Sequence, residues 1–198
     1  MLVISTLHIA AIVAAYLIGS LSSAIILCKL AGLPDPRSEG SGNPGATNVL
    51  RIGGKKLAVM VLFIDVVKGV LPVAIVGMAG FNLTWVAATA FAVFLGHLYP
   101  VFFQFKGGKG VAVYLGILFS FSINLSMLFV VSWLIILFFS KYSSLSSLVT
   151  TLLIFIYSII FKSFNESTFF FIIFIIIIYT HRENIIRLKN KKENKIKF

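Results

Sequence analysis

Three short polar segments interrupt an otherwise apolar chain and hold nearly all of its side chains that could do chemistry. The first reads Ser-Glu-Gly-Ser-Gly-Asn-Pro-Gly-Ala-Thr-Asn over 38–48 and is followed by Arg51. Its three glycines let the backbone turn N–H groups toward an anion. An ordinary polar loop is the alternative, but this density of polar groups favours function. The candidate residues are Ser41, Asn43, Gly45, Thr47, Asn48 and Arg51, whose guanidinium would supply a charged fork.

The second segment places glycines and lysines directly before an apolar run. It contains His97 and then reads Phe-Lys-Gly-Gly-Lys-Gly over 105–110. Glycines at a helix start, with lysines beside them, suit a phosphate at the helix N-terminus. The segment is not a Walker A loop, which needs Ser or Thr after its Gly-Lys. A turn with positive-inside charge explains the pattern equally well, so Gly107, Gly108, Lys109 and Gly110 are candidates on this evidence alone.

The third segment, 181–188, follows the last apolar run. If it is helical, His181, Asn184 and Leu188 share one face, with Arg187 close to Asn184. Taken alone, the segment is more typical of a basic flank that stops membrane insertion.

Two charged residues lie inside an apolar segment. Asp65 and Lys68 are three residues apart, so they can pair on one helical face. The pair could support a functional site, or the two charges could only neutralise each other. The sequence leaves both roles open.

Several chemistries are excluded or disfavoured by what the sequence lacks. Six acidic residues in all leave little to hold Mg²⁺, and no histidine is followed five positions later by aspartate, as glycerolipid acyltransferases of the His-x4-Asp type require. The Asp-rich pattern of phosphatidyl-alcohol transferases and the Gly-x-Ser-x-Gly elbow are also missing. Cys28 is the only cysteine, so this chain alone builds neither a disulfide nor a thiolate metal site. We predict no metal and no cofactor.

The elements that position these segments must be membrane helices. The 198 residues are 59% hydrophobic and 12% charged, with mean hydropathy +1.04, which makes lipid the solvent. A transmembrane helix needs roughly 20 apolar residues. We predict an all-α polytopic bundle, a single domain over 1–198 with a basic cytoplasmic tail at 181–198. Seven spans are expected, with five as the alternative, near 3–30, 57–79, 83–103, 110–122, 124–139, 145–161 and 168–180.

Charge orients the predicted spans. The net charge of +11 comes from 17 basic and 6 acidic residues, and the basic ones concentrate in 29–56, 104–110 and the tail. The positive-inside rule places these segments in the cytoplasm and the N-terminus outside. Contact with anionic bilayer lipids explains the positive charge, so we predict no nucleic-acid partner.

Together, Ser41 to Asn48, Gly96 to Pro100 with Phe105 to Gly110, and His181 to Leu188 resemble the three signatures of the bacterial acyl-phosphate-dependent (PlsY-type) glycerol-3-phosphate acyltransferases. The resemblance spans about 19–195 and extends to the segment from Asp65 to Gly69. One departure is Lys191, which stands where the family has a glycine.

The resemblance implies transfer of a fatty acyl group from acyl phosphate to the 1-position hydroxyl of glycerol 3-phosphate. The products are lysophosphatidic acid and phosphate, and the active site faces the cytoplasm at the bacterial inner membrane. It implies no metal and no direct use of acyl-CoA or acyl-carrier protein. By position, the catalytic residues are Ser41, Arg51, Lys109, His181 and Asn184, the glycines 107, 108 and 110 shape the phosphate loop, and Asp65, Lys68, His97 and Arg187 support them.

Two alternatives stay open. The family is thought to use a substrate phosphate as the base, whereas His181 itself could take the proton. A membrane carrier for an organic phosphate is the rival function, although the chain shows neither the internal repeat nor the midplane polar site expected of a transporter. The oligomeric state is not predicted.

Overall fold

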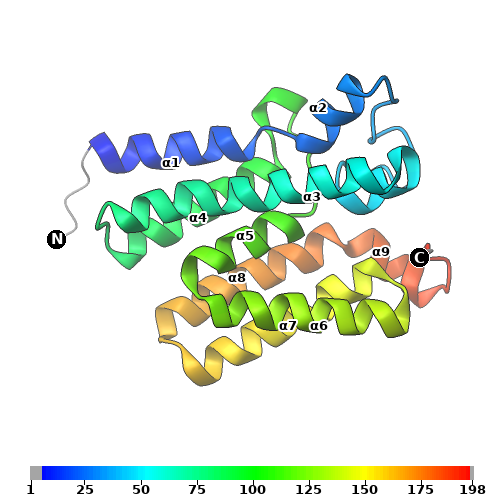
Figure 1. Cartoon of the computed structure of the whole chain (residues 1–198). Helices are drawn as coiled ribbons and strands as arrows, with labels where there is room; N and C mark the ends of the chain where they lie inside the picture. The colour runs from blue at the N-terminus through cyan, green and yellow to red at the C-terminus, as the bar shows by residue number, and fades with distance from the viewer. Residues whose placement is uncertain (1–5, 197–198) are drawn as a thin grey trace. The chain divides into compact units, whose positions relative to one another are not determined.

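The computed structural model describes residues 6–196, and within that range the regular secondary structure is entirely helical (Figure 1). The prediction of an all-α protein is confirmed. Residues 3–5 of the first predicted span and 197–198 of the predicted tail lie outside the described residues.

The helices group into two compact units, Met1–Phe121 and Ser122–Phe198, and each is described by itself. The single domain over 1–198 therefore stays a prediction. The first unit contains α1 (Thr6–Gly19), α2 (Ser23–Leu30), α3 (Ala46–Met78), α4 (Leu83–Leu98), the 3-10 helix η1 (Val101–Phe103) and α5 (Val111–Phe121). The second contains α6 (Ile123–Ser140), α7 (Ser143–Phe161), α8 (Phe164–Thr180) and α9 (Arg182–Lys189).

Four described helical segments are long and apolar enough to cross a bilayer: α3, Leu83–Phe103, α6 and α7. The count rises to six if α1 with α2, bent by 42°, and α8 with α9, bent by 60°, are each one span. The short helix α5 coincides with the predicted fourth span. The number of seven spans stays a prediction, because α5 has only 11 residues.

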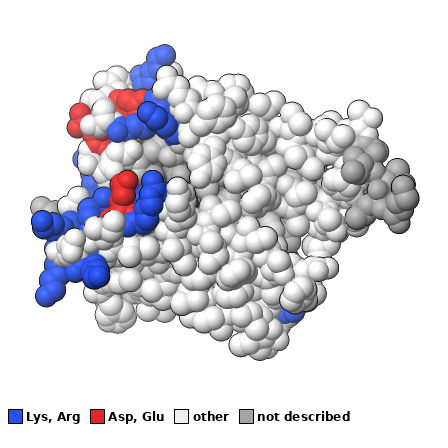
Figure 2. Space-filling model, turned by 180° about the vertical axis from the view of Figure 1, so that it is seen from behind, with Lys and Arg blue, Asp and Glu red and all other residues white. Residues whose placement is uncertain are grey.

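Apolar side chains point outward from both units. Val59, Phe63 and Ile75 are exposed on the first unit, and Phe139 and Phe161 on the second. Figure 2 shows a face on which most of the visible surface carries no charge. Contact of such a surface with hydrocarbon is favourable, and its exposure to water costs free energy, as the composition predicts.

In the first unit, α4 packs against α1 and α3, and α3 packs against α5. The crossing of α3 and α5 depends on Gly69 and Gly116. A Cβ at Gly69 would collide with the Val113 carbonyl, and one at Gly116 with the Val66 carbonyl. The hydrophobic effect does not drive helices together inside a bilayer, because lipid is as apolar as the side chains. Small residues let the two helices approach closely, so that van der Waals packing of their backbones stabilises the contact.

Helix α3 changes direction near its start. Gly54 has φ 79° and ψ −179°, which separates a short first section carrying Arg51 from the long apolar section that follows. A left-handed φ of this kind costs glycine little. The break lets one helix serve both as the end of a polar connection and as a span.

In the second unit, α7 packs against α6 and α8, and its buried face is rich in serine and threonine. The Trp133 indole N–H donates to Ser147 Oγ at 3.1 Å, and Ser132 Oγ bonds Thr150 Oγ1 at 3.2 Å. These bonds join α6 to α7 through polar groups that lipid cannot satisfy.

Candidate functional site

The connection between α2 and α3 is shaped by one buried side chain, Asn48. Its Oδ1 accepts the Ser41 backbone N–H at 2.9 Å, and its Nδ2 donates to the carbonyls of Pro36 at 2.8 Å and Glu39 at 2.9 Å. Asn48 is 1% exposed, so these bonds form away from water. Both amide hydrogens are used within the protein, which makes Asn48 the anchor of the turn that carries Ser41.

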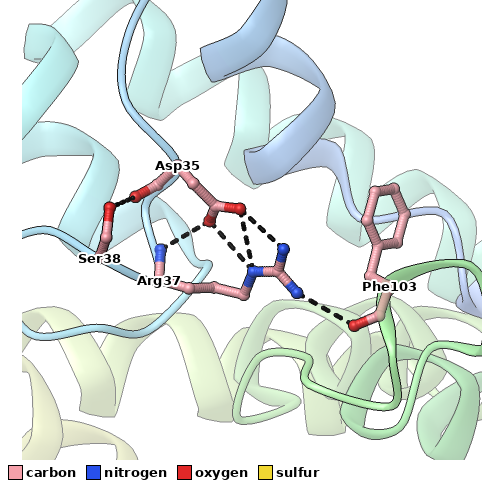
Figure 3. A network of polar contacts seen from close by, with 4 residues as sticks. All are labelled: Asp35, Arg37, Ser38 and Phe103. Carbon is pink, nitrogen blue, oxygen red and sulfur yellow. Dashed lines mark hydrogen bonds and ion pairs between the residues drawn. The ribbon is translucent and has the colours of Figure 1, made fainter.

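The same connection carries an ion pair, between Asp35 and Arg37. Arg37 Nη2 lies 2.7 Å from Asp35 Oδ2, and Arg37 Nε donates to both carboxylate oxygens at 3.1 Å (Figure 3). The hydrogen bond from Arg37 lowers the pKa of Asp35, although partial burial opposes it. Arg37 Nη1 also donates to the Phe103 carbonyl at 3.0 Å. The guanidinium thus ties the connection before α3 to the one before α5.

The glycine-rich loop before α5 lies directly on His97. The backbone N–H groups of Gly107 and Gly108 donate to the carbonyls of Leu98 and His97, both at 3.1 Å. A Cβ at Gly108 would collide with His97 Nε2 and would lie 3.2 Å from the Pro44 carbonyl oxygen. The two glycine-rich loops are therefore adjacent within the first unit, and α5 begins at their junction. The N–H groups of a first helical turn have no intrahelical acceptor, so this end of α5 suits an anion.

A buried charged cluster lies behind that loop. Lys68 Nζ is 2.9 Å from Asp65 Oδ1, confirming the pairing that their spacing allows. Ser23 Oγ donates to Asp65 Oδ1 at 2.8 Å, and Lys68 donates to the Leu21 carbonyl at 2.8 Å, where the chain turns from α1 to α2. His97 Nδ1 lies 3.8 Å from Asp65 Oδ1. The pair thus stabilises a helix break, and its carboxylate lies beside the histidine under Gly108.

The remaining polar candidates of the first unit are at least partly accessible from outside the protein. Ser41, Asn43, Thr47 and Lys109 are half-buried, and Arg51 is exposed at the start of α3. Gly45 is the N-cap of α3, and Gly110, with φ 85°, packs on the Phe94 ring. The structure thus brings the first two predicted segments together around adjacent loops.

The third segment lies in the second unit, at the junction of α8 and α9. His181 is 3% exposed, and its Nδ1 lies 2.8 Å from the Ile177 carbonyl oxygen. A carbonyl only accepts, so Nδ1 carries the proton and, in the neutral ring, Nε2 is the acceptor. Asn184 lies on the buried face of α9.

Glu193 organises this segment. Its Oε1 accepts from Asn184 Nδ2 at 2.6 Å and from Ser144 Oγ at 2.7 Å, while Oε2 accepts from Arg187 Nε at 2.8 Å. Burial acts to raise the pKa of Glu193, but the bonds from Arg187, Asn184 and Ser144 outweigh it and lower the pKa. The carboxylate therefore joins the tail to α7 and α9.

Three residues with these organising roles are absent from the candidates found in the sequence: Asp35, Arg37 and Glu193. The Asp-x-Arg spacing was a usable signal, because a two-residue separation permits a local ion pair. Ser144, one partner of Glu193, lies 49 positions away in sequence, which no local pattern reveals. Among the described residues, no group of three or more His, Cys, Asp or Glu side chains could hold a metal ion.

The helices and loops together define an all-α integral membrane protein with adjacent glycine-rich loops suited to anions. Comparison with known proteins narrows this class. The family model described as glycerol-3-phosphate acyltransferase matches residues 9–191. The chain is 48% identical over 191 residues to the glycerol-3-phosphate acyltransferase of Ruthia magnifica subsp. Calyptogena magnifica, covering 96% of this chain and 97% of that one. It is 45% identical over 196 residues to that of Shewanella sediminis, covering 98% and 96%.

Solved structures are also similar to this chain over nearly its whole length. The glycerol 3-phosphate form of PlsY (YgiH), an integral membrane glycerol 3-phosphate acyltransferase, matches with TM-score 0.91 and 40% identity, covering 96% of each chain. Its lysophosphatidic acid form matches with TM-score 0.88 and 39% identity, covering 96% and 95%. The chain belongs to the PlsY-type glycerol-3-phosphate acyltransferase family. It is a multi-pass bacterial membrane protein.

Proposed function

We propose that this protein transfers a fatty acyl group from acyl phosphate to the 1-position hydroxyl of sn-glycerol 3-phosphate. The products are lysophosphatidic acid (1-acyl-glycerol 3-phosphate) and inorganic phosphate, in the first step of phosphatidic acid and phospholipid biosynthesis. The enzyme class and the acceptor follow from the family, which the match over residues 9–191 establishes. We infer that acyl phosphate is the donor from the three signature segments and the missing His-x4-Asp motif.

The observation that carries the proposal is the contact of the two glycine-rich loops in the first unit. Gly108 lies against the Pro44 carbonyl, so the loops that hold Ser41 and Lys109 adjoin. Both substrates end in phosphate, and neighbouring loops of this kind give each phosphate backbone and side-chain donors. Lys109 and Arg51 would neutralise phosphate charge, and Ser41, Asn43 and Thr47 would donate hydrogen bonds.

The chemistry needs little from a protein nucleophile. Acyl phosphate is a mixed anhydride, so the hydroxyl oxygen attacks the acyl carbon directly. The bond between that carbon and the phosphate oxygen then breaks, phosphate leaves with the electron pair, and the hydroxyl proton passes to a base. Positioning and neutralisation of the leaving charge supply much of the acceleration.

His181 has two possible roles in this reaction. Because its Nδ1 donates to the Ile177 carbonyl, Nε2 of the neutral ring is an acceptor that would either orient the glycerol hydroxyl or take its proton. We propose orientation, with Asn184 as a second positioning group and a substrate phosphate as the base. A His181→Gln enzyme that keeps most of its kcat would exclude His181 as the base. Abolished turnover would leave the two roles unseparated.

We propose further that the loops face the cytoplasm, with the N-terminus outside and seven spans. In the first unit, every Lys and Arg except the buried Lys68 lies in the 29–56 and 104–110 connections, which supports this orientation. Single cysteines in place of Ser38 and Lys191 should resist an impermeant thiol reagent in intact cells, and one in place of Asn82 should react. The background is low, because Cys28, the only native cysteine, is buried. Labelling at Ser38 from outside would reverse the orientation.

The decisive assay is phosphate release by detergent-purified protein given palmitoyl phosphate and glycerol 3-phosphate. Palmitoyl-CoA is the comparison donor, and Lys109→Ala is the variant control. Release should require glycerol 3-phosphate, yield lysophosphatidic acid and disappear in Lys109→Ala. Turnover with palmitoyl-CoA but not with palmitoyl phosphate would refute the proposed donor.

A further inference from the structure

The Asp35–Arg37 ion pair reaches beyond its own connection. We propose that it is a positioning clasp, which holds the 104–110 loop at a fixed distance from the 38–48 loop and so sets the affinity for a substrate phosphate. This inference rests on the proposed function, because it assigns the two loops to phosphate binding. Neither side chain is placed in contact with substrate.

The guanidinium is suited to this role by its shape. It is planar and carries five N–H donors, so it can bind a carboxylate and still have a donor facing elsewhere. Here Nε and Nη2 bind Asp35, and Nη1 donates to the Phe103 carbonyl across 66 positions of sequence (Figure 3). The carboxylate neutralises Arg37 and fixes the orientation of its guanidinium. The pair therefore acts as a structural contact and not as a free cation.

The point that Arg37 contacts is the start of a strained turn. Gln104 and Phe105, the two residues after Phe103, have φ of 58° and 57°, a left-handed conformation that side chains rarely adopt. The Phe103 carbonyl also accepts the Lys106 backbone N–H at 3.2 Å. Arg37 therefore binds the same oxygen that closes the turn leading into the Gly107–Gly110 loop.

A second contact lies farther along the same loop, where Gly108 packs against the Pro44 carbonyl. That contact is van der Waals packing against a small residue and offers no directional bond. Without the hydrogen bond from Arg37, the 104–110 loop would keep this contact and its own backbone hydrogen bonds, but it would lose its directional bond to the connection before α3. Donors on the two loops would then fit a phosphate less closely, while the reacting groups would remain present.

The expected signature is a change in binding rather than in chemistry. For Arg37→Gln and Asp35→Asn, KM for glycerol 3-phosphate or acyl phosphate should rise about tenfold, with kcat at saturation within about twofold of wild type, since small misplacements of binding groups have effects of this order. Arg37→Lys should fall between, because an ammonium cannot bind the carboxylate and the carbonyl with one planar fork.

The kinetic test uses detergent-purified full-length protein, with the inhibition constant of inorganic phosphate as a direct reading of the anion site. Lys162→Gln is the matched control, because Lys162 also belongs to an ion pair, with Glu166 at 3.5 Å, but lies in the second unit outside the three polar segments. Arg37→Gln should raise the phosphate inhibition constant in step with KM, and Lys162→Gln should change neither. Equal effects of the two variants, or a loss of kcat at unchanged KM, would overturn the proposal.

A binding measurement separates this inference from the proposed reaction. Cys28 is fully buried in the first unit, so its reaction with a thiol dye on heating reports unfolding there. Inorganic phosphate should raise the wild-type midpoint, and Arg37→Gln should lose most of that rise. If wild type binds phosphate but shows no turnover, the proposed function fails. The clasp is then tested by the phosphate-induced rise in the unfolding midpoint alone, compared between wild type and Arg37→Gln. If Arg37→Gln does not fold, the same comparison with Arg37→Lys decides, and a full phosphate shift in that variant would refute the clasp.

Discussion

Replacing Glu193 by glutamine tests the role of its carboxylate in the second unit. The Glu193 side chain is 7% exposed and accepts hydrogen bonds from Ser144, Asn184 and Arg187. Glutamine has nearly the same shape, and its remaining oxygen can still accept from Ser144 and Asn184. Its NH₂ group would face the Arg187 Nε–H, so two donors would meet where an ion pair now exists.

The expected loss of stability follows from the hydrogen bond between Arg187 and Glu193 that the substitution removes. A hydrogen bond to a charged partner contributes about 1.5–3 kcal/mol. The Arg187 side chain is 31% exposed, so water replaces part of the interaction. We expect the free energy of unfolding of this unit to fall by about 1.5 kcal/mol, about a tenfold change in the unfolding equilibrium.

Tryptophan fluorescence can follow that unit alone. The protein has two tryptophans, and Trp133 bonds Ser147 within the second unit. In a Trp85→Phe background, reversible unfolding in mixed micelles with SDS would therefore report only the second unit. Glu183→Gln is the matched control, because Glu183 also faces Arg187, at 3.8 Å, but its side chain is 69% exposed. That change should cost at most about 0.5 kcal/mol.

The pH dependence gives a second reading. A carboxylate whose pKa is lowered by folding stabilises the protein above its ordinary pKa of 4.5, and this stabilisation is lost as pH falls through the lower folded-state value. Wild type should lose stability below about pH 4.5 more steeply than Glu193→Gln. If Glu193→Gln and Glu183→Gln unfold at the same SDS fraction, and the acid limb is unchanged, the assigned role of Glu193 is wrong.

Three further predictions concern the first unit. Asn48→Asp should weaken it by about 2 kcal/mol in Cys28-monitored unfolding, because a carboxylate would face the Pro36 and Glu39 carbonyls that now accept hydrogen bonds. Gly108→Ala should lower kcat/KM at least about tenfold, since its methyl group would strike His97, while Gly77→Ala, with open space around its Cβ, should match wild type. Asp65→Asn should destabilise by about 3 kcal/mol in the same unfolding assay, and adding Lys68→Met should restore part of the loss, because one buried charge without its partner costs more than none.

The sequence predicted the helices of the second unit closely. The spans expected at 124–139 and 145–161 are α6 (Ile123–Ser140) and α7 (Ser143–Phe161). Hydropathy is a local sum, and backbone groups in lipid must be satisfied within their own segment, so a long apolar run has few alternatives to a helix.

The first predicted span, 3–30, proved less regular. Its described part consists of α1 and α2 with a bend of 42°, and the break is stabilised by Lys68, which lies 47 positions from Leu21 in sequence. Local hydropathy carries no information about a cation that arrives from another helix. The break at Gly54 had a local cause, but a glycine inside a helical pattern does not by itself specify a left-handed φ.

In the tail, too, one feature could be predicted from the sequence and another could not. Lys191, at a position where the resemblance implies a glycine, adopts φ 56° just after α9. A left-handed φ favours glycine, so the resemblance identified a position with a glycine-like backbone conformation. The bond from Ser144 to Glu193 was not predictable, because Ser144 lies on α7, 49 positions away in sequence.

The sequence by itself determined the all-helical membrane architecture, the three polar segments and the family, because these depend on composition and on residues close together in the chain. Only the tertiary structure decided that Arg37 binds the Phe103 carbonyl and that Gly108 lies between His97 and Pro44. Hydrogen bonds act over about 3 Å, so a partner is fixed by where the chain returns in space and not by its position in the sequence.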